Sequence, residues 1–106
     1  MEANVILELQ KKYFQTGATR DVEMLKNVLI NLRVEILNRE NDIYEALYKD
    51  FKKSKFEAYL GEIGIVITEI DATLKHINSW SKPKKVRASL LNFPSRDYIY
   101  SEPYGT

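Results

Sequence analysis

The side chains that could carry catalysis are few and scattered in this sequence. His76 is the only histidine, and with no cysteine in the chain no second histidine or thiolate stands at a metal-binding spacing. The carboxylates Glu57, Glu62 and Glu69 carry no sign of burial in a shared cleft, which an acid–base pair requires. Without cysteine, these residues also hold no thiolate nucleophile and no disulfide. The pattern therefore favours structural or solvated roles, and it predicts neither a catalytic residue nor a metal ligand here.

Phosphate-binding chemistry is not visible either. The sequence has no glycine-rich motif of the dinucleotide-binding or P-loop type, so we expect no cofactor-binding residue in it. The basic stretch KPKKVR, at residues 82–87, could contact phosphate, but a solvated connector beside the negative end of a helix is the favoured interpretation. Tyr98, Tyr100 and Tyr104 could stack on bases, yet alternate tyrosines in a strand more often pack or form an interface. No nucleic-acid partner is expected.

Length and composition limit the protein class. A chain of 106 residues supports at most one compact domain. With 16 basic and 15 acidic residues the net charge is +1, which gives no strong attraction to nucleic acid or anionic membranes. No apolar run is long enough for a transmembrane helix, and Glu2 with a short apolar stretch argues against a signal peptide. We therefore expect a cytoplasmic protein.

The first half of the chain has the periodicity of helices. A short helix is predicted from about Asn4 to Gln15, with Gly17 as its left-handed C-terminal cap. Thr19 is predicted to cap a second helix. Its apolar stripe steps by three and four through Val22, Leu25, Leu29, Leu32 and Ile36. The polar run NREND at residues 38–42 interrupts that stripe. There we predict a new helix, started by a capping box of Asp42 with Glu45 and running to about Asp50, with one continuous bent helix as the alternative.

A longer helix is predicted from about Lys55 to Trp80, opened by a capping box of Ser54 with Glu57. Gly61 and Gly64 each cost ~1 kcal/mol relative to alanine inside a helix, so we expect close approach of another backbone or a ligand to offset them. Two tolerated, exposed glycines are the alternative. The predicted core face consists of Phe56, Leu60, Ile63, Ile67, Ile70, Leu74 and Ile77, and a second, smaller stripe consists of Gly61, Ile65, Thr68 and Ala72.

Pro83 ends this helical pattern, and the last part of the chain is predicted to form a β-hairpin or arm. The segment DYIYSEPY alternates apolar and polar residues as a strand does. Two strands are marginal alone in water, so the hairpin is expected to need a further sheet. The predicted fold class is mainly α, with three to four helices followed by the hairpin or arm.

Three stretches of sequence in this order are distinctive together: YFQTGATRDVE, then IYEALYKDFKKSKFEAYLGEIGIVITEID, then FPSRDYIYSEPYG after a WSKPKKV segment. With them the chain resembles the beginning of an aldehyde dehydrogenase of the class-three, fatty-aldehyde type. The resemblance implies the N-terminal part of that α/β fold. It assigns residues 1–81 to the helical layer of the cofactor-binding domain, and residues 82–106 to the strands of the bridging or oligomerisation arm that leads into the dinucleotide-binding core. The chain would then be one incomplete domain.

The resemblance also implies an activity for the whole parent protein, which would oxidise aliphatic or aromatic aldehydes to carboxylic acids with NAD or NADP. The family's catalytic cysteine, asparagine and glutamate would all lie beyond Thr106, so the segment alone is expected to be inactive. The helix carrying Gly61, Glu62 and Ile65 would border the substrate entrance. The implied partners are the rest of the chain, the aldehyde and a second subunit in a homodimer. The alternative function is a free-standing helical interaction module that binds through the Gly61 face and the tyrosine arm.

Overall fold

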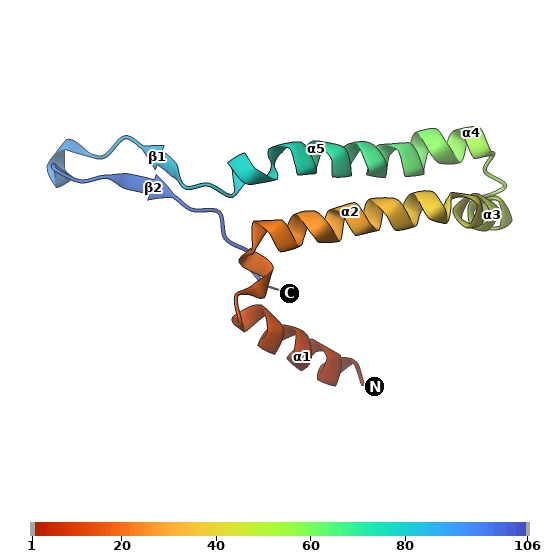
Figure 1. The fold of residues 1–106 in the computed structure, drawn as a ribbon, viewed down its shortest axis with the longest axis horizontal. Helices are drawn as coiled ribbons and strands as arrows, with labels where there is room; N and C mark the ends of the chain where they lie inside the picture. Colours follow the sequence, from red (N-terminus) through yellow and green to blue (C-terminus); the bar gives the residue numbers. More distant parts are fainter. Residues whose placement is uncertain (1, 106) are drawn as a thin grey trace. The chain divides into compact units, whose positions relative to one another are not determined.

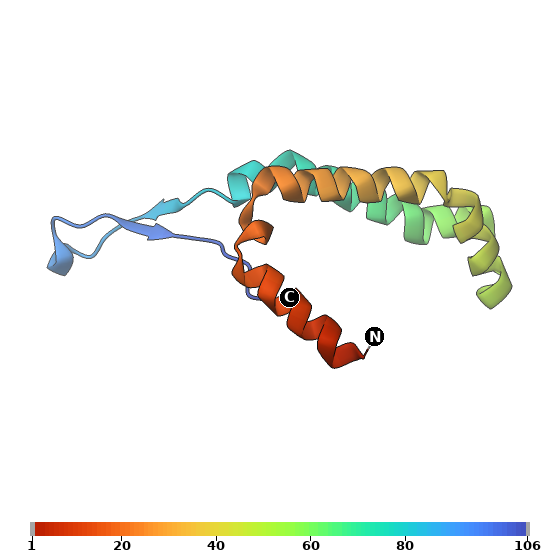
Figure 2. The same ribbon diagram turned by 60° about the horizontal axis from the view of Figure 1, so that its bottom comes forward.

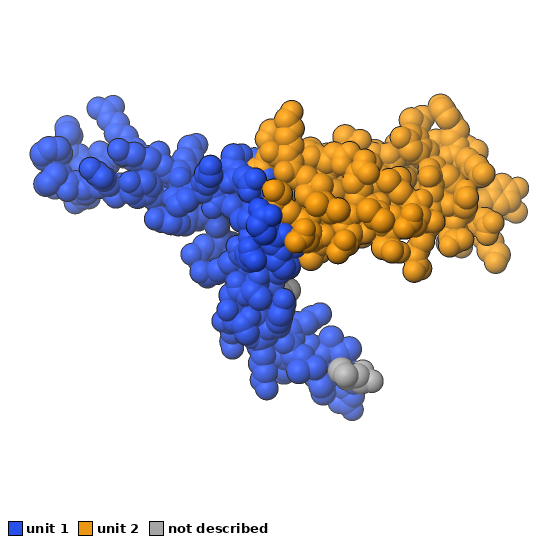
Figure 3. All heavy atoms as spheres, in the orientation of Figure 1, with its two compact units in different colours: residues 1–25, 77–106 blue, residues 26–76 orange. Residues whose placement is uncertain are grey.

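The computed structural model describes residues 2–105, which divide into two compact units (Figure 3). One unit contains residues 26–76, and the other contains residues 1–25 together with 77–106. The mainly helical fold with a terminal hairpin is as predicted (Figure 1). Its elements are α1 (Ala3–Gln15), η1 (Ala18–Arg20), α2 (Val22–Asn38), α3 (Glu40–Phe51), α4 (Lys55–Ala58), η2 (Tyr59–Ile63), α5 (Gly64–Trp80), β1 (Lys84–Val86), η3 (Leu90–Asn92) and β2 (Asp97–Ile99).

The junction between α1 and α2 confirms one sequence prediction and corrects another. Gly17 has a φ of 78°, the left-handed conformation expected of a residue that follows a helix. Thr19 does not cap α2, because it lies inside the single 3-10 turn η1. Asp21 caps the helix instead, since its Oδ1 accepts a hydrogen bond from the backbone N–H of Glu23 at 3.1 Å. The cap therefore falls two residues later than predicted.

Helices α2 and α3 are separated only at Arg39. The Arg39 N–H still bonds the Glu35 carbonyl, and the Ile43 N–H bonds the Arg39 carbonyl, both at 3.0 Å. Because these backbone bonds bridge the break, α3 needs no side-chain cap and begins before Asp42. The predicted capping box of Asp42 with Glu45 was therefore wrong, although a new helix does begin in this stretch.

The long helix after α3 contains a π-helical turn. Ser54 caps its start as predicted, because its Oγ accepts a hydrogen bond from the Glu57 N–H at 3.3 Å. The segment α4 then passes into the π-helical turn η2, which ends where the Gly64 N–H donates to the carbonyl of Tyr59, five residues earlier. Such a turn holds one residue more than an α-helical turn. The side chains of α4, before the turn, are consequently rotated around the helix axis relative to those of α5.

This extra residue changes which side chains face inward. Ala58 is fully buried and Ile63 is 3% exposed, a spacing of five residues. A continuous α-helix would instead have placed residue 59 or 60 inward. Phe56 and Leu60, predicted as core, are 72% and 54% exposed for this reason. Beyond the π-helical turn the prediction holds, since the buried apolar residues of α5 are Ile70 and Ile77, with Ile67 and Leu74 half-buried.

In the unit of residues 26–76, α2 and α5 run side by side (Figures 1 and 2), joined by a two-pronged ion pair. Arg33 Nε donates to Asp71 Oδ1 at 2.7 Å, and Arg33 Nη2 donates to Asp71 Oδ2 at 3.2 Å. This fork-to-carboxylate geometry fixes the register of the two helices. Hydrogen bonding to Arg33 lowers the pKa of Asp71, and the same pair raises the pKa of Arg33.

We expect this ion pair to make stability fall in acid. A lowered folded-state pKa means that the contribution of Asp71 is present above its unfolded value of about 3.9 and is lost as the pH falls through the folded value. The raised pKa of Arg33 matters only in strong alkali. Thermal midpoints of the full-length protein and of Asp71→Asn should therefore differ at neutral pH and converge below about pH 4. Arg33→Gln should remove the same pH dependence. A difference between the wild type and Asp71→Asn that does not change with pH would contradict the assignment.

The other unit contains a short antiparallel hairpin. Strand β1 pairs with β2 in the register Lys84 with Ile99, Lys85 with Tyr98 and Val86 with Asp97. The basic stretch at residues 82–87 is thus partly a strand, not only the solvated connector predicted for it. The peptide bond between Phe93 and Pro94 is cis. Residues exposed on the hairpin and its connection include Leu90, Leu91, Phe93, Tyr98, Ile99 and Tyr100.

Candidate functional site

The three residues predicted to border a ligand entrance, Gly61, Glu62 and Ile65, lie on the π-helical turn η2 and the first turn of α5. Ile65 is 54% exposed and lines an open hollow of about 370 Å³. This hollow, which we call the Ile65 hollow, is bounded by residues of the π-helical turn and of α5: Tyr59, Leu60, Gly64, Ile65, Thr68 and Glu69. Its walls combine apolar side chains with the hydroxyls of Tyr59 and Thr68 and the carboxylate of Glu69.

Glu62 does not line this hollow and makes a contact that the sequence did not reveal. Lys53 Nζ donates to Glu62 Oε1 at 2.9 Å, and both side chains are partly exposed. A Cβ added at Gly61 would meet the same Lys53 Nζ at 4.0 Å. Gly61 and Glu62 therefore face the turn before α4, while Ile65 lines the hollow. Lys53 and Glu62 are nine positions apart on different elements, so no helical spacing pointed to the pair.

The two helical glycines turn out to have different environments. A Cβ on Gly64 would lie 2.7 Å from the carbonyl oxygen of Tyr59, closer than real Cβ atoms come to another atom. The expected close approach of a backbone is therefore found at Gly64, and the backbone is that of its own helix. A Cβ at Gly61 would have open space around it, in agreement with the alternative prediction of a tolerated, exposed glycine. Gly64 is needed to close the π-helical turn, and Gly61 is not.

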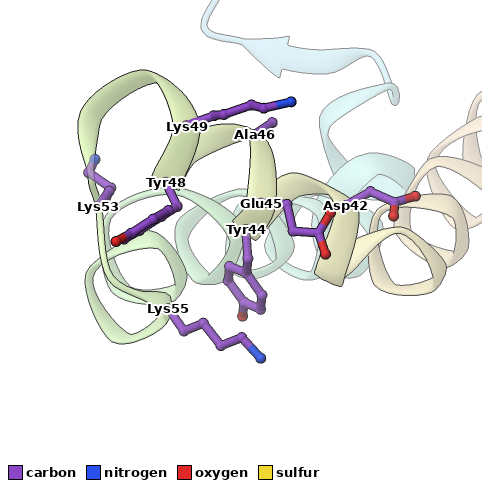
Figure 4. A pocket seen from close by; sticks show the side chains of 8 residues that line it. All are labelled: Asp42, Tyr44, Glu45, Ala46, Tyr48, Lys49, Lys53 and Lys55. Carbon is purple, nitrogen blue, oxygen red and sulfur yellow. The ribbon is translucent and has the colours of Figure 1, made fainter.

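A second, larger hollow of about 620 Å³ lies against α3 and the turn after it (Figure 4). Two tyrosine rings here are approached by cations: Lys52 Nζ is 5.1 Å from the ring centre of Tyr48, and Lys55 Nζ is 6.0 Å from that of Tyr44. The hydroxyl of Tyr44 donates to Glu40, and this bond is the main reason that the pKa of Tyr44 rises to about 12. A tyrosine with that pKa stays protonated near neutral pH and cannot act there as a general base.

The remaining titratable candidates do not assemble into a reactive centre. Among residues 2–105, no three His, Cys, Asp or Glu side chains gather closely enough to hold a metal ion. Within this part of the chain no strand leads into a helix through a glycine-rich turn, so these residues do not fit the phosphates of a nicotinamide cofactor. No helix in the described part is long and apolar enough to cross a membrane. What the described residues form is two open surface hollows, the Ile65 hollow and the one against α3.

Comparison with known proteins gives consistent relatives. No protein-family model matches the chain. It is 44% identical to the 4,4'-diaponeurosporen-aldehyde dehydrogenase of Staphylococcus aureus over 91% of this chain and 21% of that protein. It is 34% identical to aldehyde dehydrogenase family 3 member I1 of Arabidopsis thaliana, a chloroplastic protein, over 98% of this chain and 19% of the other.

A solved structure described as the substrate-bound state of Staphylococcus aureus AldH matches with a TM-score of 0.91 and 39% identity. That match covers 98% of this chain and 23% of the solved chain. The present chain thus spans about a fifth of the length of the relatives it matches.

Proposed function

Because the chain belongs to the class-three aldehyde dehydrogenases and corresponds to their N-terminal part, we propose that it serves as the N-terminal segment of an enzyme that oxidises aliphatic or aromatic aldehydes to carboxylic acids. The observation that carries this proposal is the likeness to the AldH structure along 98% of the chain at 39% identity. A free-standing helical interaction module is not favoured, since the likeness extends across nearly every element.

In this proposal the reactive groups come from the rest of the protein. The chain has no cysteine to attack an aldehyde carbonyl, and its described residues do not fit NAD or NADP. We therefore propose that the part of the full-length protein outside this segment supplies the nucleophile and binds the cofactor. The cytoplasm is the proposed compartment, because a reducing environment keeps a catalytic thiol free.

The contribution we propose for this segment at the site is to border the substrate entrance with Gly61, Glu62 and Ile65. In support, Ile65 lines an open hollow, and Lys53 Nζ donates to the carboxylate of Glu62, three residues earlier on the chain, at 2.9 Å. The Staphylococcus aureus relative at 44% identity is named for an aldehyde substrate, 4,4'-diaponeurosporen-aldehyde. The entrance would guide an aldehyde inward without taking part in bond making.

We further propose that residues 1–81 form the helical layer of the cofactor-binding domain and that residues 82–106 form a bridging arm between the subunits of a homodimer. In support, β1 and β2 have only three residues each and pair only with each other among the described residues. Each therefore has a free edge, and a two-stranded sheet needs further strands to be stable.

The proposal is tested by comparing the full-length protein with the segment of residues 1–106. The full-length protein should reduce NAD or NADP when given a medium-chain aldehyde, and the carboxylic acid should appear in equal amount. The segment alone should give no reduced cofactor above a protein-free control, because it lacks the nucleophile. An inactive full-length protein, or a robust and dose-dependent reaction from the purified segment, would refute the proposal.

A further inference from the structure

The connection between β1 and β2 carries three of the most exposed apolar side chains of residues 2–105. Leu90, Leu91 and Phe93 are 86%, 95% and 81% exposed, and we call these three residues the apolar tip. They lie on the turn η3 and directly after it, at the end of the hairpin beyond its paired residues (Figure 1). Adjacent apolar side chains with this exposure indicate a surface that makes an interaction.

The segment that holds the apolar tip is strongly basic. Residues 82–97 contain five basic side chains and one acidic side chain, which gives a net charge of +4. The whole chain has a net charge of +1, so all its other residues together carry −3. The five basic side chains, which we call the basic collar, are all exposed: Lys82, Lys84, Lys85, Arg87 and Arg96.

The basic collar also lacks acidic partners. Within residues 2–105, none of its five side chains forms an ion pair with a carboxylate. Basic side chains elsewhere do form such pairs, as Arg33 does with Asp71 and Lys53 does with Glu62. Unpaired cations are costly to bury in a protein, so the basic collar favours a position at the surface of the full-length protein, facing water or an anionic partner.

The backbone of the apolar tip satisfies its own hydrogen-bond donors. The N–H of Leu91 donates to Ser89 Oγ at 3.3 Å, and the N–H of Phe93 donates to the Leu90 carbonyl at 3.3 Å. The N–H between them donates to the Ser89 carbonyl at 3.0 Å, and Pro94, which follows, has no N–H. The tip therefore leaves water without an unpaired donor in residues 91–94, which an apolar environment requires.

An apolar tip beside a basic collar fits a surface that is apolar below and anionic above. We propose that this hairpin binds the surface of an anionic lipid membrane, with the apolar tip in the headgroup boundary and the basic collar against the lipid phosphates. A protein interior fits less well, because Arg87 and Arg96 each stand three residues from the tip and would be drawn in with it. The paired residues 84–86 and 97–99 lie outside the tip, so the proposed bridging role of the strands is compatible with this contact.

The test measures binding of the full-length protein to lipid vesicles by sedimentation, and it needs no enzyme activity. The vesicles contain either phosphatidylcholine alone or equal parts of phosphatidylcholine and phosphatidylglycerol. The partition coefficient should be at least about tenfold higher on the anionic vesicles, and it should fall when salt is raised from about 0.05 M to about 0.5 M, which screens the charges.

Two pairs of substitutions separate the apolar and the electrostatic parts of the contact. Leu91→Ser with Phe93→Ser should weaken binding to anionic vesicles by about tenfold or more, because less apolar area leaves water. Lys84→Gln with Lys85→Gln should weaken it by about threefold to fivefold for each charge removed and should reduce its salt dependence. Lys11→Gln with Lys12→Gln removes the same charge from α1 and is the matched control, with binding expected to stay within about twofold of wild type.

Each other outcome would overturn the proposal. Wild-type protein that binds neither kind of vesicle, or both equally, rules out the anionic membrane as the partner. Equal weakening by the Lys84 and Lys85 pair and by the control pair shows that only overall charge matters. If the tip variant instead changes the mass of the protein in sedimentation velocity while vesicle binding is absent, the tip contacts another copy of the chain. Where the tip variant fails to fold, the two lysine pairs decide the question alone.

Discussion

Replacing Ile63 or Ile70 by alanine is expected to lower the free energy of unfolding of the full-length protein by about 2–5 kcal/mol, because each change opens a cavity in a packed site. These two side chains are 3% and 5% exposed and lie in the unit of residues 26–76. Denaturant unfolding followed by fluorescence or circular dichroism measures the effect. Ile63→Val removes a single methylene and is the matched control, with an expected cost of about 0.5–1.5 kcal/mol.

The two variants Ile63→Val and Ile63→Ala separate a loss of stability due to packing from a loss due to other causes. A loss that grows from valine to alanine at residue 63 follows the volume removed, as a cavity requires. Surface substitutions typically change the free energy of unfolding by no more than about 0.5 kcal/mol. If Ile63→Ala and Ile70→Ala both have free energies of unfolding within that range of the wild type, the core described for this unit is wrong.

The sequence was sufficient wherever the signal was local. The Ser54 cap and the left-handed Gly17 were predicted because each depends on residues within one turn of helix. The inward face of α5 was predicted from Ile63 onward because a regular period of 3.6 residues applies there. The N-terminal part of the same face was missed because the π-helical turn adds one residue, and apolar spacing alone gives no sign of it. Phe56 and Leu60 therefore appeared to belong to the core.

The contacts around the candidate site were beyond sequence reasoning for a different reason. Arg33 and Asp71 are 38 positions apart, and Lys53 and Glu62 lie on opposite sides of a helix start. Such pairs depend on tertiary geometry, and both signs of charge are common all along the chain. Gly64 did carry a usable signal, since a glycine inside a helix needs a reason. The sequence could not tell whether that reason was a ligand, a neighbouring chain or its own helix.

The surface of α2 shows why this segment should depend on the rest of the protein. The row that faces α5 contains Leu29, Arg33 and Ile36, which are half-buried. Apolar side chains nevertheless continue around both flanks of the helix, where Val28 and Leu32 lie on one side and Ile30, Val34 and Leu37 on the other, all exposed. A helix that is apolar around most of its circumference is normally buried on most sides. Helix α5 covers only one of them.

The separated segment of residues 1–106 is expected to lose cooperative folding, which is the largest effect we predict. Most of its large apolar side chains are exposed, among them Val28, Ile30 and Leu32 in the unit of residues 26–76. Only four apolar residues among those described are buried: Ala58, Ile63, Ile70 and Ile77. Burial on that scale is too small to offset the conformational entropy of about a hundred ordered residues.

Hydrogen exchange read by mass spectrometry measures this directly on the peptide of residues 58–77. In the full-length protein its amides should exchange slowly, and in the separated segment they should exchange faster by about 100-fold or more, because local opening is no longer opposed by the covering surface. Helix propensity alone cannot protect these amides from exchange, since isolated helices of this length are marginally stable in water. Equal protection in both proteins, together with a single sharp urea transition of the segment, would mean that the helices of residues 26–76 are a self-sufficient core. The exposed apolar side chains on the flanks of α2 would then need an explanation other than contact with the rest of the full-length protein.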